Sequence, residues 1–416
     1  MIGFAVLLIF SSCQKRIYQE EDNTVSKWSL WSDETQLRGI NIWQKKIDRE
    51  LDENFIGEGT FGPQFTADDF KKIRSMGVNY VNISHPGIYT VDYPYIPDTD
   101  ALKNLKNLIT MIGEADMFAV ISFRTGPGRS EYTFYYGEDI QSDPENGWFD
   151  EKYYNEEVWK SAEAQNGWRM MWNLAAREFL NNPYVVGYDL MVEPNSAEVI
   201  LGISEPSEFY PKYSGTLLDW NFMFPGIINS IRAIDSDIPI LAGASFYSNL
   251  DWLPFLTTVS DPKTLYSFHQ YSPFEYTHQG RKSKISYPGK LDINGDSIPD
   301  EFNKTWLSSF LNTAKEFMQN KNVRTAANEY GCVRWAGNGK DFLKDQMEIF
   351  ESLGINYAIW EWSSYYEPFR SEVDNFNYLM GTDQDNRSDI ENNELIGVLK
   401  TFWSKNIRRP SNTFFN

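Results

Sequence analysis

The sequence predicts a single (β/α)₈ TIM barrel, an α/β fold, with long insertions in the loops that follow its strands. From residue 36 onward, short apolar segments alternate with longer amphipathic segments, a pattern that favours a parallel sheet covered by helices. Eight of the apolar segments have the length of a buried strand, the number that closes such a barrel. A length of 416 residues fits one barrel with insertions.

The predicted elements follow one another as strand and helix along the chain. Thr66 is a good N-cap for the first helix and Gly77 a good stop, while Asn182-Pro183 ends a later helix. The strands are predicted at 37–43, 78–83, 118–123, 185–191, 239–242, 265–268, 323–327 and 357–362. The helices are predicted at 66–76, 99–115, 156–180, 217–234, 305–320 and 340–352, and a long aromatic loop at 125–155.

Composition and charge limit the classes of partner. The net charge of −20 repels nucleic acid, anionic lipid and acidic polysaccharide, so a neutral or cationic partner is expected. Aromatic residues make up 16% of the chain, which suits the flat faces of sugars as well as a large aromatic core. The three histidines lack the spacing of a zinc site, and no Gly-x-Ser-x-Gly motif of a serine hydrolase is present.

Two glutamates stand where predicted strands end. Glu193 follows the fourth strand and Glu329 lies at the end of the seventh. Because the carboxyl ends of barrel strands meet at one face, we expect the two side chains to lie close together. Cleavage of a glycosidic bond needs such a pair: one carboxyl protonates the leaving oxygen, and the other attacks the sugar or activates water.

Neighbouring strand ends add an imidazole, a phenol and two indoles. Alternation along the sixth strand places His269 and Tyr271 on one face, where they can orient the two carboxylates. The same alternation along the eighth strand puts Trp360 and Trp362 on one face, which makes them candidates for the floor of a sugar site or for core residues.

These segments together resemble the cellulase-type glycoside hydrolase family 5 or a closely related family of the same clan, over about residues 36 to 365. The resemblance rests on Arg38-Gly-Ile-Asn41, Gly77-Val-Asn79, Glu193-Pro194, His269-x-Tyr271, Pro273-Phe274, Thr277-His278-Gln279, Asn328-Glu329-Tyr330-Gly331 and Trp360-Glu361, in that order.

The resemblance implies a barrel enzyme that works by double displacement, with retention of configuration and without a metal in catalysis. Glu193 would be the acid/base and Glu329 the nucleophile. Tyr271 would donate a hydrogen bond to Glu329, His269 would line the site near Glu193, and Trp360 would form the floor of the subsite beside the cleaved bond.

The sequence also departs from the family pattern. Val192 stands where the family has an asparagine that binds the sugar 2-hydroxyl, and Asn82 stands on strand two where the family has an arginine. Arg124 is a candidate substitute for the guanidinium, and Asn195 or Asn328 for the amide. His85 and Trp43, at the ends of strands two and one, complete the expected set of substrate-binding residues.

We therefore expect a retaining hydrolase of neutral β-glycans of the β-glucan or β-mannan type. Two alternatives stay open. The departures at Val192 and Asn82 favour a catalytically impaired glycan-binding protein, and a cleft that prefers a sugar acceptor over water would make the chain a transglycosidase.

A second candidate site is an acidic loop after the sixth strand. Asp292, Asn294, Asp296 and Asp300 place oxygen ligands at the spacing of a loop that wraps calcium, although the twelfth position is Asn303 rather than glutamate. A bound calcium would be structural, and an acidic surface turn is the alternative.

The first residues resemble a bacterial lipoprotein signal. The apolar run 3–10 is too short to cross a bilayer as a helix, and two serines precede Cys13 directly. We expect residues 1–13 to be a signal segment with lipidation at Cys13, 14–30 a polar tether, and 31–416 the catalytic domain of a monomer. This organisation predicts lipid anchoring at the bacterial cell envelope, in the periplasm or at the outer-membrane surface; an ordinary signal peptide or a strand is the alternative.

Overall fold

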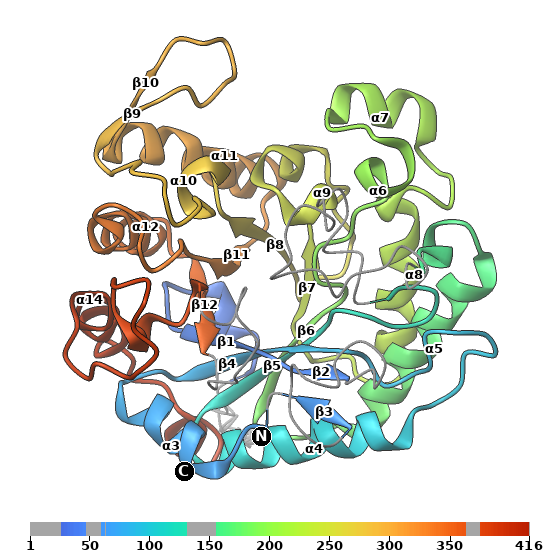
Figure 1. The fold of residues 1–416 in the computed structure, drawn as a ribbon. Helices are drawn as coiled ribbons and strands as arrows, with labels where there is room; N and C mark the ends of the chain where they lie inside the picture. The colour runs from blue at the N-terminus through green and yellow to red at the C-terminus, as the bar shows by residue number, and fades with distance from the viewer. Residues whose placement is uncertain (1–25, 47–59, 63, 131–154, 363–374, 416) are drawn as a thin grey trace, which may run out of the picture.

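A computed structural model describes residues 26–46, 60–62, 64–130, 155–362 and 375–415. Eight parallel strands close into a barrel in the order β1, β4, β5, β6, β7, β8, β11 and β12, with β12 paired back to β1 (Figure 1). Their bounds are Arg38–Trp43, Tyr80–His85, Phe118–Phe123, Val185–Asp189, Ile240–Gly243, Thr264–Gln270, Thr325–Tyr330 and Asn356–Trp362. The predicted (β/α)₈ fold is confirmed, and each of the eight predicted strands overlaps a strand of the barrel.

Helices surround the barrel and bury their apolar faces against it (Figure 1). The larger ones are α3 (Ala67–Ser75), α4 (Thr99–Glu114), α5 (Ala162–Glu178), α8 (Trp220–Arg232), α11 (Lys304–Lys321), α12 (Gly339–Ser352) and α14 (Glu394–Trp403). Thr66 caps α3 as predicted, because its hydroxyl accepts a hydrogen bond from the Asp69 amide and the Asp69 carboxylate accepts one from the Thr66 amide.

Several short elements were not predicted, because they are too brief to show a period in the sequence. They are α1 (Ser29–Ser32), β2 (Lys45–Lys46), β3 (Phe61–Gly62), η3 (Glu157–Trp159), α6 (Ala197–Leu201), α7 (Pro206–Tyr213), α9 (Ser245–Ser248), η4 (Leu250–Phe255), α10 (Phe274–Thr277), β9 (Gly289–Leu291), β10 (Asp300–Phe302), η5 (Tyr378–Met380) and α15 (Pro410–Thr413). α6 and α9 follow the carboxyl ends of β6 and β7, where they shape the mouth of the barrel.

The amino-terminal end of the barrel is closed by the segment that precedes β1. Leu30 and Trp31 are buried in an apolar cluster with the first residues of the strands, and the Trp31 indole donates a hydrogen bond of 2.9 Å to the carbonyl of Val186. The predicted boundary of the tether at residue 30 is therefore too late, because Leu30 is already part of the barrel. Cys13 and the rest of the predicted signal and tether, up to residue 25, lie outside the described residues. Within the described part of the chain, no helix is long and apolar enough to cross a membrane.

The strand β11 contains an irregularity that determines the site. Ala327 pairs with Tyr357 and Tyr330 pairs with Ile359, so β11 holds one residue more than β12 between these pairs. Such a bulge interrupts the alternation of side chains. As a result, the consecutive residues Asn328 and Glu329 both contact groups in the barrel interior.

Candidate active site

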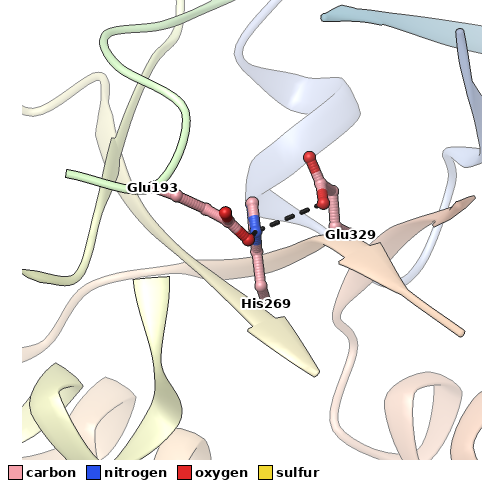
Figure 2. A group of neighbouring side chains, drawn as sticks. All are labelled: Glu193, His269 and Glu329. Atoms are coloured by element: carbon pink, nitrogen blue, oxygen red, sulfur yellow. Dashed lines mark hydrogen bonds and ion pairs between the residues drawn. The ribbon is translucent and has the colours of Figure 1, made fainter. Parts of the chain in front are cut away.

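Glu193, His269 and Glu329 converge at the carboxyl ends of three strands (Figure 2). Glu193 follows β6, His269 lies on β8 and Glu329 on β11. Nδ1 of His269 lies 2.7 Å from Oε1 of Glu193 and 3.4 Å from Oε2 of Glu329. One ligand-type atom from each of the three residues lies within 4.8 Å of the others, which places both carboxylates in one small space.

Burial and mutual repulsion control the charges of this group. Burial, reinforced by the negative charge of Glu193, raises the pKa of Glu329 to about 7. Burial also acts on Glu193, but the hydrogen bond and charge of His269 outweigh it and lower the pKa of Glu193. The pKa of His269 is raised: burial opposes its charge, but the surrounding carboxylates, Glu329 foremost, more than compensate. Below about pH 7, the two carboxyls therefore hold one proton between them, and these pKa shifts place it on Glu329.

Tyr271 and a deeper layer of polar residues support Glu329. The Tyr271 hydroxyl donates a hydrogen bond of 3.2 Å to Oε2 of Glu329. Beneath, Asn328 Nδ2 donates a hydrogen bond of 2.6 Å to Asp189 Oδ2, and Ser122 Oγ lies 3.1 Å from the same oxygen. Burial raises the pKa of Asp189 to about 7, although His269 and these hydrogen bonds oppose the shift.

Asn82 belongs to the same buried layer. Its amide donates a hydrogen bond of 2.7 Å to Asn41 Oδ1, and its own Oδ1 lies 2.7 Å from Ser122 Oγ. Asn41 in turn donates to the carbonyl of Asn328 at 2.9 Å. The network ties β1, β4, β5, β6 and β11 together below the carboxylates, so Asn82 acts from beneath rather than at the mouth.

The backbone at Glu193 is held by an arginine that the sequence reasoning did not select. Glu193 has a φ of 51°, in the left-handed region that is unfavourable for a residue with a Cβ. Arg129 Nη1 donates a hydrogen bond of 2.6 Å to the carbonyl of Val192, and Nη2 donates one of 2.7 Å to the carbonyl of Glu193. Arg129 is almost fully buried, so this clamp fixes the turn that presents the carboxylate.

Arg124 lies between two of the predicted aromatic residues. Its guanidinium carbon is 5.6 Å from the ring centre of Trp43 and 5.5 Å from that of Trp360, distances typical of cation–π contacts. Its charge contributes to the low pKa of Glu193 and opposes the rise in the pKa of Glu329. The structure thus brings Trp43, Arg124 and Trp360 together beside the carboxylates.

Two of the expected substrate-binding residues lie elsewhere. His85 is fully buried on the outer side of β4, where its Nε2 is 3.2 Å from Asn104 Oδ1 of α4 and its ring contacts Phe61 and Phe123. Trp362 is buried, and Lys72 of α3 lies over its ring. The pairing of β1 with β12 shifts between Ile40↔Ile359 and Ile42↔Trp362, which breaks the alternation on which the prediction for Trp362 depended.

Asn195 lies in the loop after β6, across the barrel from β12, the strand that holds Trp360. Its Oδ1 accepts a hydrogen bond of 3.1 Å from the Glu198 amide, and its Nδ2 donates one of 3.3 Å to Glu198 Oε2. Asn328, the other candidate for the missing amide, points to Asp189 instead.

The acidic loop forms the tip of the β9–β10 hairpin, which projects outward from the barrel beyond α10 and α11 (Figure 1). Its side chains accept hydrogen bonds from the loop's own amides: Asp292 from Ser297, Asn294 from Asp296, and Asp296 from Ile298. Asn303, at the twelfth position, caps α11, because its Oδ1 accepts hydrogen bonds from the amides of Thr305 and Trp306. Calcium at this loop stays a prediction.

Asp189 and Arg129 are the site residues that the sequence reasoning missed. An aspartate inside the apolar strand 185–191 was a visible signal, because a buried strand rarely carries a charge without a partner. Arg129 gave no such signal, since it lies in a loop with several other charged residues.

Comparison with known proteins shows relatives of this chain in sequence. A sequence model of the cellulase family, glycosyl hydrolase family 5, matches residues 32–366. Cellodextrinase A of Ruminococcus flavefaciens is 23% identical over 333 residues, which cover 77% of this chain and 83% of that protein. Endoglucanase C of Acetivibrio thermocellus is 23% identical over 219 residues, which cover 46% of this chain and 58% of that protein.

Solved structures share the fold. Endoglucanase Cel5A from the hyperthermophilic Thermotoga maritima superimposes with a TM-score of 0.59 at 18% identity, covering 90% of this chain and 100% of that one. A hyperthermophilic endo-β-1,4-glucanase in complex with substrate gives a TM-score of 0.59 at 19% identity, covering 91% and 100%. The match over most of the barrel shows that the chain belongs to the cellulase family, glycosyl hydrolase family 5, and is a glycoside hydrolase.

Proposed function

We propose that this chain hydrolyses neutral β-glucans with retention of configuration. The observation that carries the proposal is the distance between the two carboxylates, whose nearest oxygen atoms lie within 4.8 Å. Retaining glycosidases place their carboxyl groups about 5–5.5 Å apart, whereas inverting enzymes need about 6.5–9.5 Å to admit a water molecule. The spacing therefore supports direct attack by one carboxylate.

The substrate class follows from the relatives and from charge. The curated relatives are a cellodextrinase and endoglucanases, which favours a β-glucan over a β-mannan. The net charge of −20 disfavours anionic polysaccharides.

In the first step, Glu329 attacks the anomeric carbon while Glu193 protonates the leaving oxygen. The bond from carbon to the leaving oxygen breaks as the bond to Glu329 forms. In the second step, Glu193 removes a proton from water, which attacks the same carbon and releases Glu329. The pKa directions place the single proton of the pair on Glu329 in the free chain, so the reaction requires its transfer to Glu193 when substrate binds. His269 Nδ1, which lies near both carboxylates, is positioned between donor and acceptor of this transfer.

Proton NMR of the first product released from a β-1,4-gluco-oligosaccharide tests the proposal. We expect the β-anomer to form first, and mass spectrometry after reaction with a 2-deoxy-2-fluoro glycoside to find the label on Glu329. An α-anomer as first product would refute retention. A label on another residue would remove Glu329 from the role of nucleophile.

A catalytically impaired glycan-binding protein is the second candidate, and Val192 favours it because this residue cannot donate a hydrogen bond from its side chain to a sugar hydroxyl. A screen of β-glucans and β-mannans with detection of new reducing ends separates the two. Binding without turnover, unchanged in Glu193→Gln and Glu329→Gln, would support the binding protein. Sugar transfer in acceptor-rich buffer would instead indicate a transglycosidase.

We further propose that the chain is a monomer anchored at a bacterial envelope through lipid on Cys13. Labelling of expressing cells with a palmitate analogue, compared with Cys13→Ala, tests the anchor. Sedimentation of the barrel domain tests the monomer.

A further inference from the structure

The bulge in β11 interrupts the pairing of this strand with both of its neighbours. Against β12 the register shifts between Ala327 and Tyr330, and against β8 it shifts between Ala326 and Glu329. Asn328 lies inside both intervals, where the regular ladder of hydrogen bonds is disrupted. Contacts other than those of the ladder therefore have to hold this residue in place.

Side chains from three strands that are not adjacent to β11 hold Asn328. Its carbonyl oxygen accepts a hydrogen bond of 2.9 Å from Nδ2 of Asn41 on β1, and Nδ2 of Asn82 on β4 lies 3.4 Å from the same oxygen. Its own Nδ2 donates a hydrogen bond of 2.6 Å to Oδ2 of Asp189 on β6. All four side chains are buried, so these contacts cross the interior of the barrel.

These contacts fix the peptide group that joins Asn328 to Glu329. The carbonyl held by Asn41 and Asn82 belongs to that peptide group, and Asp189 holds the side chain of the same residue. The orientation of this peptide group sets the direction in which the Glu329 side chain leaves the backbone. The buried layer thus fixes the backbone of Glu329, while the Tyr271 hydroxyl contacts its carboxylate.

Asp189 is the acidic member of this otherwise neutral layer, whose other members are Asn41, Asn82, Ser122 and Asn328. When ionised, its carboxylate is a stronger acceptor than a neutral oxygen. Its second oxygen, Oδ1, is buried and accepts no hydrogen bond from any residue that the structure describes. An unsatisfied buried carboxylate oxygen destabilises a fold, which indicates that Asp189 serves a purpose other than stability.

We propose that Asp189 is a positioning residue for Glu329: by holding Asn328 in the bulge, it directs the neighbouring carboxylate toward the anomeric carbon. The inference rests on the proposed role of Glu329 as nucleophile. Asp189 is buried beneath the site and acts through Asn328 rather than on the substrate. A displacement of about 1 Å at a catalytic group can cost about a hundredfold in rate, so the loss of this anchor is measurable.

The main variant is Asp189→Leu, which removes the acceptor and keeps a side chain of similar size. We expect kcat on a β-1,4-gluco-oligosaccharide to fall about a hundredfold with little change in KM. kcat/KM for 2,4-dinitrophenyl β-cellobioside, whose leaving group needs no protonation, should fall by a similar factor, because attack by Glu329 is needed for both substrates. Asp189→Asn keeps an oxygen that can accept from Asn328, so it should restore most of the lost activity.

A double-mutant cycle tests whether Asp189 acts through Asn328. Asn328→Ala removes the other partner of the hydrogen bond and should lower kcat to a similar extent. In the Asn328→Ala background, Asp189→Leu should lower kcat less than about twofold further, because the contact is already lost. Losses that multiply in the double variant would overturn the inference. Should Asp189→Leu not fold, Asp189→Ser, which is too short to reach Asn328, takes its place in the cycle.

Asp235→Leu is the matched control. Asp235 is a buried aspartate in the loop before β7, where its Oδ1 accepts hydrogen bonds from the amides of Asp237 and Ile238. This variant should lower the free energy of unfolding, measured with denaturant, but leave kcat of the folded protein unchanged.

Three results would overturn the inference while the proposed function stands. They are full activity of Asp189→Leu, a rise in KM at constant kcat, and a loss confined to the oligosaccharide, which would mean that Asp189 serves Glu193 instead. If the wild-type chain cleaves neither substrate, the proposed function itself fails, and the inference fails with it.

Discussion

Nδ1 of His269 lies 2.7 Å from Oε1 of Glu193, and the same nitrogen is within 3.4 Å of Glu329. One imidazole therefore contacts and stabilises both carboxylates of the proposed reaction. This contact connects the pH dependence of activity to a single side chain.

The first prediction concerns that pH dependence. The reaction needs one proton on the pair of carboxyls, and the pair loses it as pH rises through about 7, the value to which burial raises the pKa of Glu329. kcat/KM of the wild type should therefore fall above about pH 7. His269→Asn removes a positive charge that lowers both pKa values, so the basic limb should move to higher pH while the rate falls.

A control for this experiment is His85→Asn. Burial lowers the pKa of His85 to about 3, so this residue is neutral near pH 7 and lies outside the site. In His85→Asn, kcat/KM should fall over the same basic pH range as in the wild type. A His269→Asn variant with an unchanged pH profile would show that His269 only fills space.

The second prediction concerns the clamp on the acid/base turn. Arg129→Met removes both hydrogen bonds to the carbonyls of Val192 and Glu193. A displacement of about 1 Å at a catalytic group can cost about a hundredfold in rate, so we expect kcat to fall by that order with little change in KM. Steady-state kinetics on an oligosaccharide measures kcat and KM separately. A rise in KM at constant kcat would mean that Arg129 serves substrate binding instead.

The third prediction concerns Arg124. Arg124→Leu removes a charge that lowers the pKa of both carboxyls and uncovers the rings of Trp43 and Trp360. We expect kcat/KM to fall by about two orders of magnitude, in the range of one lost electrostatic contact in an active site. Arg124→Lys keeps the charge but loses the planar stacking, so its activity should lie between that of the wild type and that of Arg124→Leu. Equal activities of Lys and Leu variants would contradict an electrostatic role.

The fourth prediction concerns the pH dependence of stability. Burial raises the pKa of Asp189 from 3.8 to about 7, so the unfolded chain releases this proton at lower pH than the folded protein does. The free energy of unfolding should therefore fall between about pH 4 and 7, by on the order of 4 kcal/mol from this residue alone. Asp189→Asn should remove that part of the fall, as denaturant unfolding at pH 5 and pH 8 can determine. Identical pH slopes for variant and wild type would exclude the effect.

The fifth prediction concerns the hairpin loop. If calcium binds Asp292, Asn294, Asp296 and Asp300, a concentration a hundredfold above Kd should stabilise the fold by roughly 2.7 kcal/mol. Calorimetry with and without a chelator measures the change in Tm. Asp296→Ala, which removes an oxygen ligand, should abolish the response, whereas Asp251→Ala, in η4 outside the loop, should not. A Tm that is insensitive to the chelator would leave the loop as an acidic turn.

The sequence was sufficient for the barrel and for the central carboxylates. The hydrophobic period of a strand differs clearly from that of a helix over long segments, so the eight strands could be predicted. Glu193 and Glu329 could be selected because they stand at the predicted ends of two of these strands. The alternation of side chains along a strand was not applied to His85, and it does not hold where the pairing of two strands is irregular. His85 is three residues from the inward-facing Asn82 and must face outward, and a register shift in β12 turns Trp362 away. Arg129 acts through a loop conformation that no period in the sequence encodes.

The closure of the barrel base by Leu30 and Trp31 has a consequence for orientation. The chain enters the folded domain at the end opposite to the catalytic carboxylates. A protein tied to a surface through this entry would direct its catalytic opening outward, toward polymer arriving from the surroundings. Moving the attachment point to the carboxyl-end loops should therefore hinder long chains more than short oligosaccharides.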